Sequence, residues 1–364
     1  MSTDHLADDV IGLLMQLIEI PSFSGEESQT ADCIQNWLHS KGVETQRIQN
    51  NVFAFNKHYD PAKPNLLLNS HHDTVRPNKA YTRDPHKAEI IDGKLFGLGS
   101  NDAGGALVSL LGLFAHFYEA ENLTYNLIVA ATAEEESSGP NGLNSLLKDL
   151  PVVDVAIVGE PTQMQLAIAE KGLVVFDAVV KGTAGHAAHP NNDNPIIKTM
   201  DVIQWFQNLS FDKVSDTLGP VKLTITQINA GSQHNVVPAQ VNLVLDVRVN
   251  ECYTNQEIAD LVGQAPCEVT ARSLRLQSSS IDNNHPLVVA GVVMGRNTYG
   301  SPTLSDQAAL SCPSLKLGPG DSTRSHTADE FIYENEMKEA VRLYIELLDQ
   351  VITSWKSGKK KEQK

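Results

Sequence analysis

Five residues that can bind a metal ion, with one carboxylate to spare, are the most chemically informative feature of the sequence. They are two histidines and three acids: His71, Asp102, Glu136, Glu160 and His326. Zinc and similar ions take imidazole and carboxylate ligands, and hydrolases with two such ions place them about 3.5–4 Å apart around a shared bridging group. The set suffices for two ligands per ion and one bridge. Glu135 is left over, and a carboxylate near such ions could act as a general base.

The spare carboxylate belongs to an acidic triplet, Glu134 to Glu136, which follows the apolar run Leu127–Ala131. Three adjacent carboxylates at the end of a buried strand repel one another and lose hydration together, so a cation is expected nearby. A solvated acidic turn before a helix N-terminus, where negative charge is favoured, explains the triplet equally well by itself.

Each candidate ligand also has a purely structural explanation. His71 could be a satisfied core histidine, and its neighbour His72 fits that description better. Asp102 could cap the helix that follows it, Glu160 could neutralise a nearby lysine, and His326 could bind a loop carbonyl. Singly, these explanations are as good as metal binding. Five ligand-type residues at the mouth of one sheet are much harder to explain by five separate coincidences.

Short buried strands are expected immediately before three of these sites. The runs Asn65–Asn69, Leu127–Thr132 and Val153–Val158 are apolar without alternation, as in strands that are buried on both faces. Ligands bind at the carboxyl ends of the strands in open α/β sheets, so residues far apart in the chain can converge there. A short strand over 314–317 leads in the same way toward His326.

Helices are expected around these strands, because apolar residues recur with a period of 3.6. The segments are 6–18, 31–38, 106–118, 286–296 and 337–351. The helix after Gly97–Gly105 is apolar nearly all round and should be central. The glycine-rich segment before it lacks the complete GxGxxG spacing, which argues against a dinucleotide site.

The middle of the chain has a different order of elements. Strands are expected over 174–180, 221–228, 241–249 and 268–276, and helices over 195–209 and 254–262. This βαββαβ order is the ferredoxin-like pattern, which closes as a two-layer unit. We therefore predict an α/β catalytic domain of residues 1–174 and 283–364, interrupted by an inserted domain of residues 175–282, with 278–284 as the return linker.

Composition narrows the function. The 364 residues are 41% hydrophobic and 20% charged, which describes a globular chain long enough for two domains. A formal net charge of −16 argues against nucleic acid or an anionic membrane as partner and leaves a small-molecule substrate. Four scattered cysteines, no signal-like N-terminus and no long apolar run predict a cytoplasmic protein. The basic block Lys356–Lys364 is interpreted as a solvated tail.

Several segments, in chain order, resemble the dinuclear zinc aminoacylase and carboxypeptidase family, which includes acetylornithine deacetylase, succinyl-diaminopimelate desuccinylase and glutamate carboxypeptidases. The segments are Pro21–Glu26, His71–Val75, Gly97–Gly105, Thr132–Glu136, Gly159–Thr162, Gly182–Pro190 and Ser325–Glu330. The resemblance covers nearly the whole chain. It implies a zinc-exopeptidase-like catalytic domain, a mixed sheet flanked by helices, and an inserted ferredoxin-like βαββαβ dimerisation or lid domain.

The resemblance also assigns roles in the site. One zinc ion would lie between His71 and Glu160, the other between Glu136 and His326, with Asp102 as the bridge; cobalt and manganese are the alternative metals. Asp73 would orient the imidazole of His71 through its other ring nitrogen, as residues behind a metal ligand commonly do. Glu135 would take a proton from the attacking water and pass it to the leaving amine.

In the inserted domain, the resemblance makes His186 the group that stabilises the tetrahedral oxyanion from the partner subunit of a homodimer. His189 is the rival within the same segment. Three further positions are expected to bind substrate: Asn235, Arg248 and Lys171. Arg248 suits an α-carboxylate because its planar fork binds bidentately, and pairing with Asp246 is the alternative.

These assignments predict hydrolysis of the N-acyl amide of an amino acid. The favoured substrate is N-acetyl-L-ornithine, or N-acetyl-citrulline or N-succinyl-ornithine, in arginine biosynthesis. Succinyl-diaminopimelate desuccinylase is the first alternative, although Glu170–Gly172 departs from its arginine-rich segment; a dipeptidase or carboxypeptidase with the same zinc pair is the second. A non-catalytic binding protein of this fold would have no need of Glu135.

Overall fold

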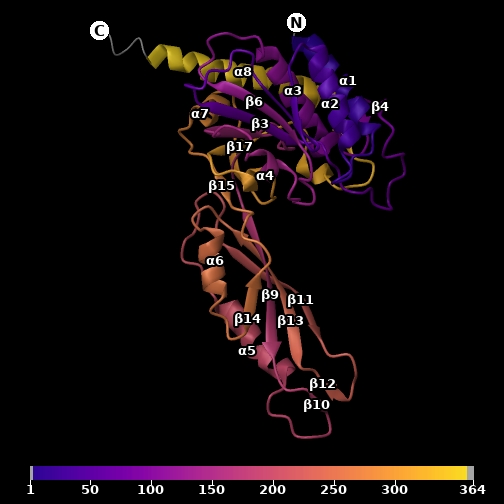
Figure 1. The fold of residues 1–364 in the computed structure, drawn as a ribbon, viewed down its shortest axis with the longest axis vertical. Helices are drawn as coiled ribbons and strands as arrows, with labels where there is room; N and C mark the ends of the chain where they lie inside the picture. Colours follow the sequence, from indigo (N-terminus) through magenta and orange to yellow (C-terminus); the bar gives the residue numbers. More distant parts are fainter. Residues whose placement is uncertain (1–2, 359–364) are drawn as a thin grey trace. The chain divides into compact units, whose positions relative to one another are not determined.

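The structure, a computed structural model, describes residues 3–358, with side chains as far as Val351. It divides into two compact units (Figure 1). The first contains Met1–Ile168, Ser280–Tyr299 and Ser305–Lys364, and the second contains Ala169–Ser279 and Gly300–Leu304. The sequence pattern placed the divisions at 174/175 and 282/283, whereas the units divide at 168/169 and 279/280. The basic block interpreted as a tail lies outside the side chains that the structure describes.

The first unit is built on a mixed sheet. Its strands are β1 (Gln46–Ile48), β2 (Asn51–Phe55), β3 (Asn65–His71), β6 (Asn126–Thr132), β7 (Val155–Val158), β8 (Leu166–Glu170), β15 (Ser279–Ser280), β16 (Thr298–Ser301) and β17 (Ser314–Lys316). They are ordered β1-β2-β6-β3-β7-β17-β8-β15, and β16 pairs with β8. β3 runs parallel to β6 and β7, and β17 runs parallel to β7, so these four strands end at the same edge.

Strand residues of the first unit alternate between two separate hydrophobic cores. On β3, Leu66 and Leu68 belong to the larger core and Leu67 to the smaller one. On β6, Leu127 faces the larger core and Ile128 the smaller one, because successive side chains of a strand point to opposite faces of the sheet. Every residue of both strands is buried, which confirms the prediction of strands covered on both faces.

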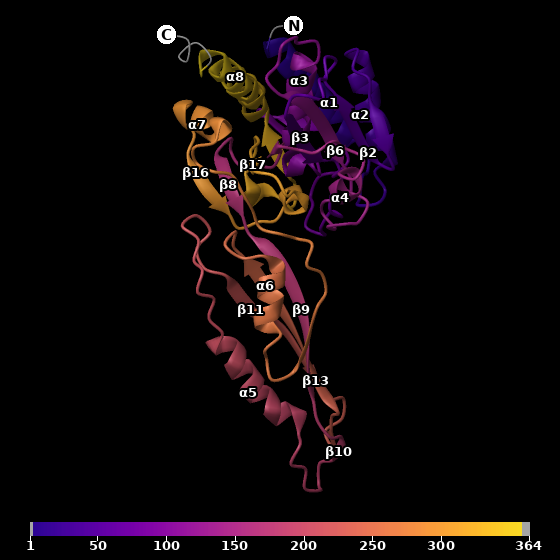
Figure 2. The same ribbon diagram turned by 60° about the vertical axis from the view of Figure 1, so that its left-hand side comes forward.

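Helices cover both faces of this sheet. Those of the larger core are α1 (Thr3–Ile18), α2 (Ser28–Ser40), α3 (Gly105–Phe117), α7 (Pro286–Val293) and α8 (Glu334–Gly358); α4 (Leu143–Leu146) belongs to the smaller core. Figures 1 and 2 show α1, α3 and α8 together on one side of the sheet. The central position predicted for α3 is confirmed, because it packs on α1, α8, β3 and β6 and is buried along most of its length.

The second unit has the expected βαββαβ order. Its elements are β9 (Gly172–Lys181), β10 (Gly185–His186), α5 (Pro195–Asn208), β11 (Lys222–Ala230), β12 (Val236–Val237), β13 (Gln240–Val249), α6 (Asn255–Val262) and β14 (Glu268–Ala271). The four long strands form an antiparallel sheet in the order β11-β13-β9-β14. Apolar residues of β9 and β13 alternate inward and pack against both helices, which gives this unit its own core.

One expected strand is shorter than predicted. The pattern predicted a strand over 268–276, but β14 ends at Ala271. The carbonyls of Leu274 and Leu276 instead accept hydrogen bonds from Nδ2 of Asn255, at 3.1 and 2.8 Å, which holds this stretch against the start of α6. Apolar spacing could not reveal this competition, because it comes from one buried amide on another element.

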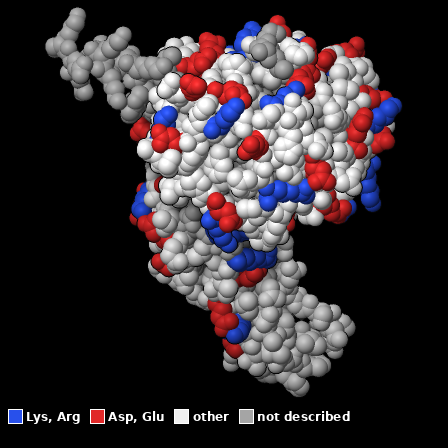
Figure 3. All heavy atoms as spheres, turned by 45° about the horizontal axis from the view of Figure 1, so that its top comes forward, with Lys and Arg blue, Asp and Glu red and all other residues white. Residues whose placement is uncertain are grey.

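Charged residues of both signs are interspersed on the face drawn in Figure 3. In the described part of the chain, oppositely charged side chains also form pairs, such as Arg324 with Glu336 at 2.7 Å and Lys57 with Glu119 at 2.8 Å. The four cysteines are free thiols. Across the described residues, every helix is too short or too polar to traverse a lipid bilayer.

Candidate metal centre

The parallel strands of the first unit bring the candidate ligands to one edge of the sheet. His71 is the last residue of β3, Glu135 and Glu136 follow β6, and Glu160 follows β7. The segment after β17 carries His326, and Asp102 lies in the short irregular helix that precedes α3. The candidate ligands therefore converge at the carboxyl ends of the parallel strands, where ligands bind in open α/β sheets.

His71 is the most deeply buried member of the group. Its Nδ1 lies 3.0 Å from the backbone oxygen of Asp73, an acceptor, so Nδ1 carries the proton and Nε2 is the free ring nitrogen. Nε2 is buried and makes no hydrogen bond to any described residue. The nearest carboxylate oxygens belong to Asp102, Glu160 and Glu135, at 3.5, 3.8 and 3.9 Å. This nitrogen therefore points at a ring of oxygens without touching one.

Those distances fit a metal ion. Two atoms bound at about 2.1 Å to a tetrahedral zinc ion lie about 3.4 Å apart, close to the spacing around Nε2. Ligand atoms of two groups, His71 with Asp102 and Glu136, and His71 with Glu135 and Glu160, all lie within 4.8 Å of one another. An orphaned ring nitrogen among carboxylates is the donor set that zinc-class ions prefer, so the residues fit such an ion.

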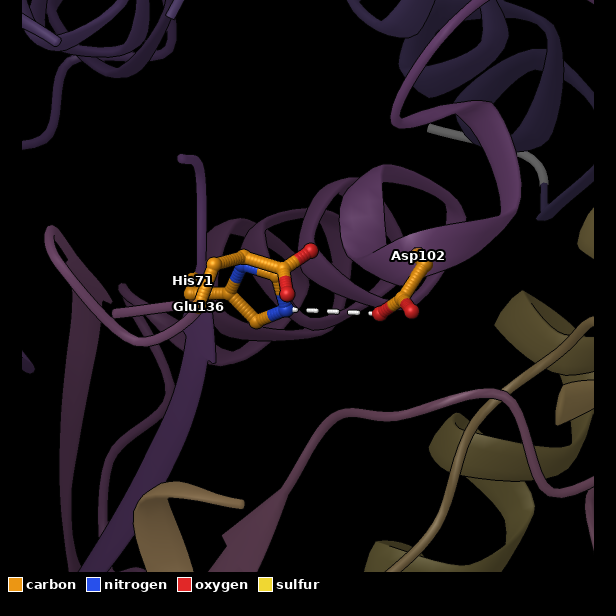
Figure 4. Close-up of side chains that lie close together, drawn as sticks. All are labelled: His71, Asp102 and Glu136. Carbon is orange, nitrogen blue, oxygen red and sulfur yellow. Dashed lines mark ion pairs between the residues drawn. The ribbon is translucent and has the colours of Figure 1, made fainter. Parts of the chain in front are cut away.

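Asp102 stands between the two imidazoles. Its Oδ1 lies 3.5 Å from Nε2 of His71, and its Oδ2 lies 3.5 Å from Nε2 of His326. Figure 4 shows the carboxylate of Asp102 facing the ring nitrogen of His71, with the carboxylate of Glu136 beside that ring. One carboxylate with an oxygen toward each histidine has the geometry that a bridging ligand needs. Asp102 does not cap α3, whose N-cap is Gly104.

The three glutamates of the acidic triplet point in three directions. Glu134 turns back on its own loop, where its carboxylate accepts hydrogen bonds from the backbone and side-chain nitrogens of Asn141 at 3.0 and 2.8 Å. Glu135 faces Nε2 of His71 at 3.9 Å, whereas Glu136 faces Nε2 of His326 at 3.0 Å. Glu135 and Glu136, neighbours in one loop, thus have ion-pair contacts with different histidines.

The electrostatics of the site show an excess of negative charge. Burial raises the pKa of Glu135 well above its usual value; the charge of His71 opposes this rise, and Glu160 and Asp306 add to it. Burial likewise raises the pKa of Glu160 to about 8. For His71, burial alone would lower the pKa, but Asp102 and Asp73 raise it well above the usual range. A cation at the centre would allow all these carboxylates to ionise.

The carboxylate of Asp73 lies beside Nδ1 of His71, the ring nitrogen through which we expected it to act. Nδ1 is 3.4 Å from Oδ1 of Asp73 and 3.0 Å from the backbone oxygen of the same residue, so its role in orienting the ring stays a prediction. The carboxylate also accepts from the backbone N–H groups of Glu135 and Glu136, at 3.0 and 3.1 Å, and from the hydroxyl of Ser24 at 2.7 Å. Asp73 therefore fixes the loop that carries two site residues.

Two acids near the site, Glu330, which is buried, and Asp306, which is partly buried, were not found from the sequence. Asp306 accepts a hydrogen bond from the hydroxyl of Thr132 at 2.6 Å, and burial raises its pKa to about 6. Glu330 accepts from the backbone N–H of Asp102 at 2.9 Å, and burial, followed by the charge of Asp102, raises its pKa to about 8. Glu330 ends a segment already noted, whereas nothing in the polar stretch around Asp306 marks it.

His72 has the structural role that we preferred for it. Its Nε2 lies 2.9 Å from the backbone oxygen of Asn50, and its Nδ1 lies 2.9 Å from the hydroxyl of Thr30. Burial lowers its pKa to about 4, so the ring is neutral and both nitrogens are occupied. His72 is therefore a satisfied core histidine.

The remaining predicted site residues lie in the second unit. His186 and Asn235 are neighbours at the β10–β12 pair, where the backbone N–H of Ala187 donates to the oxygen of Asn235 at 3.0 Å, and both side chains are exposed. Nζ of Lys171 donates to the backbone oxygen of Pro220 at 3.0 Å. These contacts all lie within the second unit. The roles of His186, Asn235 and Lys171 toward substrate stay predictions.

Arg248 makes the pairing that we gave as its alternative role. Its Nε and Nη2 donate to the two carboxylate oxygens of Asp246, at 2.9 and 3.0 Å. This bidentate contact uses the planar edge that a substrate carboxylate would need. Arg248 is therefore a weaker candidate for substrate binding than its residue type suggested.

Solved structures of similar fold come from one group of enzymes. A metallo-carboxypeptidase of the M20 family from Sulfolobus solfataricus matches with a TM-score of 0.73 and 16% identity, over 94% of this chain and 99% of that one. A tripeptidase from Staphylococcus aureus gives 0.74 and 18%, over 95% and 99%. A dinuclear metal-binding M20 peptidase from Bacillus subtilis gives 0.73 and 17%, over 96% and 99%. The predicted fold, a mixed sheet flanked by helices with an inserted unit, is confirmed.

Two relatives of similar sequence are named succinyl-diaminopimelate desuccinylase. Succinyl-diaminopimelate desuccinylase 2 of a Ruegeria species is 28% identical over 71% of this chain and 69% of its own length. Succinyl-diaminopimelate desuccinylase of a Caulobacter species is 25% identical over 93% and 95%. The sequence model of peptidase family M20/M25/M40 matches residues 67–350, a span that contains every candidate ligand. The chain therefore belongs to peptidase family M20/M25/M40 and is a metal-dependent amide hydrolase.

Proposed function

We propose that the protein hydrolyses the N-acyl amide bond of N-acylated amino acids at a centre that holds two divalent ions. The unpartnered, buried Nε2 of His71 among carboxylate oxygens at 3.5–3.9 Å is the observation that carries this proposal. One ion would be held by His71 and Glu160 and the other by Glu136 and His326, with Asp102 between them. Zinc is the metal that this donor set favours.

Glu135 is the general base in this proposal. Its side chain is 13% exposed, and its carboxylate lies 3.9 Å from the free nitrogen of His71. When bound, the ions would polarise the amide carbonyl and bring the pKa of water from about 16 to about 7. Glu135 takes the proton from the attacking water and delivers it to the leaving amine, because it is the one central carboxylate that the ligand set leaves unused.

The backbone around Glu135 is held by Asp73. The carboxylate of Asp73 accepts from the N–H groups of Glu135 and Glu136, so the base and a ligand keep a fixed separation. Glu134 closes the same loop through Asn141. A base held on both sides of its backbone loses little entropy when it meets substrate, which is how enzymes make proton transfer efficient.

The substrates that we favour are N-acylated diamino acids. Characterised relatives are named for N-succinyl-diaminopimelate, and the segments around the site resemble enzymes that act on N-acyl-ornithine. In both substrates the amide nitrogen sits on a carbon that carries a carboxylate, and a free amine lies farther along the chain. The relatives' name favours the desuccinylase reaction, and the acetylornithine reaction is the alternative that the sequence suggested.

A metal measurement and a substrate panel test this proposal. Purified protein should contain close to two zinc-class ions per chain; a folded, active protein without them would refute the centre. The panel comprises N-succinyl-diaminopimelate, N-acetyl-ornithine, N-succinyl-ornithine, N-acetyl-citrulline and simple dipeptides. The highest kcat/KM should fall on an N-acyl diamino acid. Activity on dipeptides alone would overturn the deacylase assignment in favour of a peptidase.

The proposed dimer is tested by mixing two inactive variants. Glu135→Gln lacks the base, and His186→Ala lacks the histidine that we place across the subunit interface. A hybrid dimer contains one intact site only if His186 acts on the partner subunit's centre. Recovery of activity after the two proteins are co-refolded or co-expressed supports that arrangement, and no recovery in hybrids isolated with two affinity tags contradicts it.

A further inference from the structure

Two buried side chains tie the segment that carries Asp102 to the segment that carries His326. Asn101 reaches from the first segment to the second, and Glu330 reaches from the second to the first. We call this pair the Asn101–Glu330 clasp. Both side chains are almost fully buried, Asn101 at 0% and Glu330 at 2% exposure, so their polar groups depend on these contacts.

Asn101 pairs with the backbone of Asp321 in both directions. Its Oδ1 accepts from the N–H of Asp321 at 3.0 Å, and its Nδ2 donates to the carbonyl oxygen of Asp321 at 3.1 Å. Nδ2 also lies 3.4 Å from the hydroxyl oxygen of Ser325, the residue before His326. An amide is needed here, because one side chain must offer both an acceptor and a donor.

Gly320 makes this close approach possible. Its φ is +88°, and a Cβ added to it would lie 2.4 Å from Oδ1 of Asn101. Only glycine adopts this backbone conformation readily and leaves room for the amide. The contact therefore depends on two residues, Asn101 on the first segment and Gly320 on the second.

Glu330 completes the clasp from the other side. Its Oε1 accepts from the backbone N–H groups of Asn101 and Asp102, at 2.8 and 2.9 Å, and its backbone oxygen accepts from the N–H of Gly97 at 3.0 Å. Glu330, four positions after His326, therefore fixes the backbone on the N-terminal side of Asp102. The two candidate ligands are held to each other through backbone, independently of any ion.

His326 is the ligand that most needs such support. Its side chain is 55% exposed, whereas that of His71 is 1% exposed and is held by the core around it. Its backbone has a φ of +59°, which few residues other than glycine adopt, so its surroundings must enforce the conformation. Besides the clasp, Asn78 donates an exposed hydrogen bond to the carbonyl oxygen of His326 at 3.2 Å, and Nε2 of His326 lies 3.0 Å from the carboxylate of Glu136.

We infer that Asn101 and Glu330 are positioning residues that set the affinity for the ion between Glu136 and His326. This inference rests on the two-ion centre proposed above. Loss of the clasp would let the His326 segment drift from Asp102, while His71 and Glu160 keep their places at the ends of β3 and β7. Residues behind metal ligands typically alter metal affinity about 10- to 100-fold when they are replaced, and we expect this range for one ion only.

The test compares Asn101→Asp with Asn126→Asp. Asn126 is also 0% exposed, and its amide pairs in both directions with the backbone of Asp60, at 2.8 Å each way, but at the start of β6, far along that strand from the acidic triplet. Both substitutions therefore disrupt a buried two-way pairing of an amide with backbone, and Asn126→Asp also removes donor contacts with Lys63 and Asn65, at 3.2 and 3.0 Å. Metal per chain and the zinc affinity of each site are measured after dialysis against graded chelator, together with thermal unfolding.

The expected result is that Asn101→Asp keeps one ion and binds the second about 10- to 100-fold more weakly, whereas Asn126→Asp keeps both at wild-type affinity despite a similar fall in melting temperature. Two tightly bound ions in a folded Asn101→Asp protein would overturn the inference. Should that variant fail to fold, Glu330→Leu, which removes the acceptor of both N–H groups, decides in the same assay. A wild-type protein that never binds two ions would instead refute the proposed centre.

Discussion

Replacing each member of the acidic triplet by glutamine, one at a time, separates three roles within one loop. Glutamine keeps the length and shape of glutamate but removes its charge. Glu135 and Glu136 both keep their backbone hydrogen bonds to Asp73 in these variants, at 3.0 and 3.1 Å, because those bonds use main-chain N–H groups. The loop should therefore hold its place, and any change in activity or metal content reports on the side chain itself.

The structure gives a different magnitude for each variant. Glu135→Gln should lower kcat by about 10²- to 10⁴-fold, the usual share of general acid–base catalysis and about 3–5 kcal/mol of activation free energy, with both ions retained. Glu136→Gln should lose an ion, because its carboxylate is the group that faces His326 at 3.0 Å. Glu134→Gln loses one of two contacts with Asn141, so it should cost about 0.5–1.5 kcal/mol of stability and leave kcat nearly unchanged.

The assay combines initial rates on the best N-acyl substrate, metal content of desalted protein and thermal unfolding of all three variants. Full activity in Glu135→Gln would refute the general-base role. Retention of both ions by Glu136→Gln together with loss of an ion by Glu135→Gln would show that the two side chains have exchanged roles. Wild-type behaviour of Glu134→Gln is the internal control, since it changes the same charge at the adjacent position.

Three further predictions concern the site and its support. Asp73→Asn replaces one acceptor oxygen with an amide NH₂ group that faces a backbone N–H. We expect kcat to fall by about 10- to 100-fold while the yield of folded protein is unchanged; an unchanged kcat would contradict the role of Asp73 in the loop. In metal-free protein the pKa of Glu160 is raised to about 8 by burial and that of His326 to about 9, mainly by Glu136. The folded state therefore holds protons that the unfolded chain has lost, and the free energy of unfolding, measured with urea, should fall as pH rises from about 5 to about 9; added zinc should reverse this fall, and a flat profile would contradict it. Leu67→Ala in the smaller core should cost about 2–5 kcal/mol of unfolding free energy without loss of metal, because Leu67 is fully buried four residues before His71.

The convergence of the candidate ligands was predictable because three of them follow a signal that can be read from the sequence. Apolar runs end directly at His71 and just before Glu134 and Glu160, and parallel strands meet at one edge, so convergence followed from strand order alone. The contacts of Asp73 and Asn101 were not predictable. They depend on which backbone N–H groups lie opposite a side chain from a distant segment, and spacing along the chain carries no information on that.

The same distinction explains the acids that were missed. Glu330 is buried and Asp306 is partly buried, and their carboxylates accept from an N–H group of Asp102 and from the hydroxyl of Thr132. Burial of an acid is unexpected from its residue type, and only the folded chain shows the polar group that compensates for it. Arg248 shows the converse: its residue type suits a substrate carboxylate, but Asp246 on its own strand already pairs with its guanidinium, and its role toward substrate stays a prediction.

The position of β17 in the sheet bears on the order in which a newly made chain can be completed. β17 lies between β7 and β8, although it follows both of them by more than a hundred residues in the chain. During synthesis, β7 must therefore wait with one edge unpaired until the whole second unit has emerged from the ribosome. Exposed strand edges pair readily with other chains, so this interval is when aggregation is most favoured.

β17 is the last strand of this sheet to be synthesised, and His326, the last of the candidate ligands, is synthesised after it. Metal loading and closure of the sheet should then coincide late in translation. A nascent chain stalled on the ribosome before residue 314 should bind chaperones and hold at most one metal ion. A chain extended beyond residue 351 should resist proteolysis and keep its metal ions in the presence of a chelator.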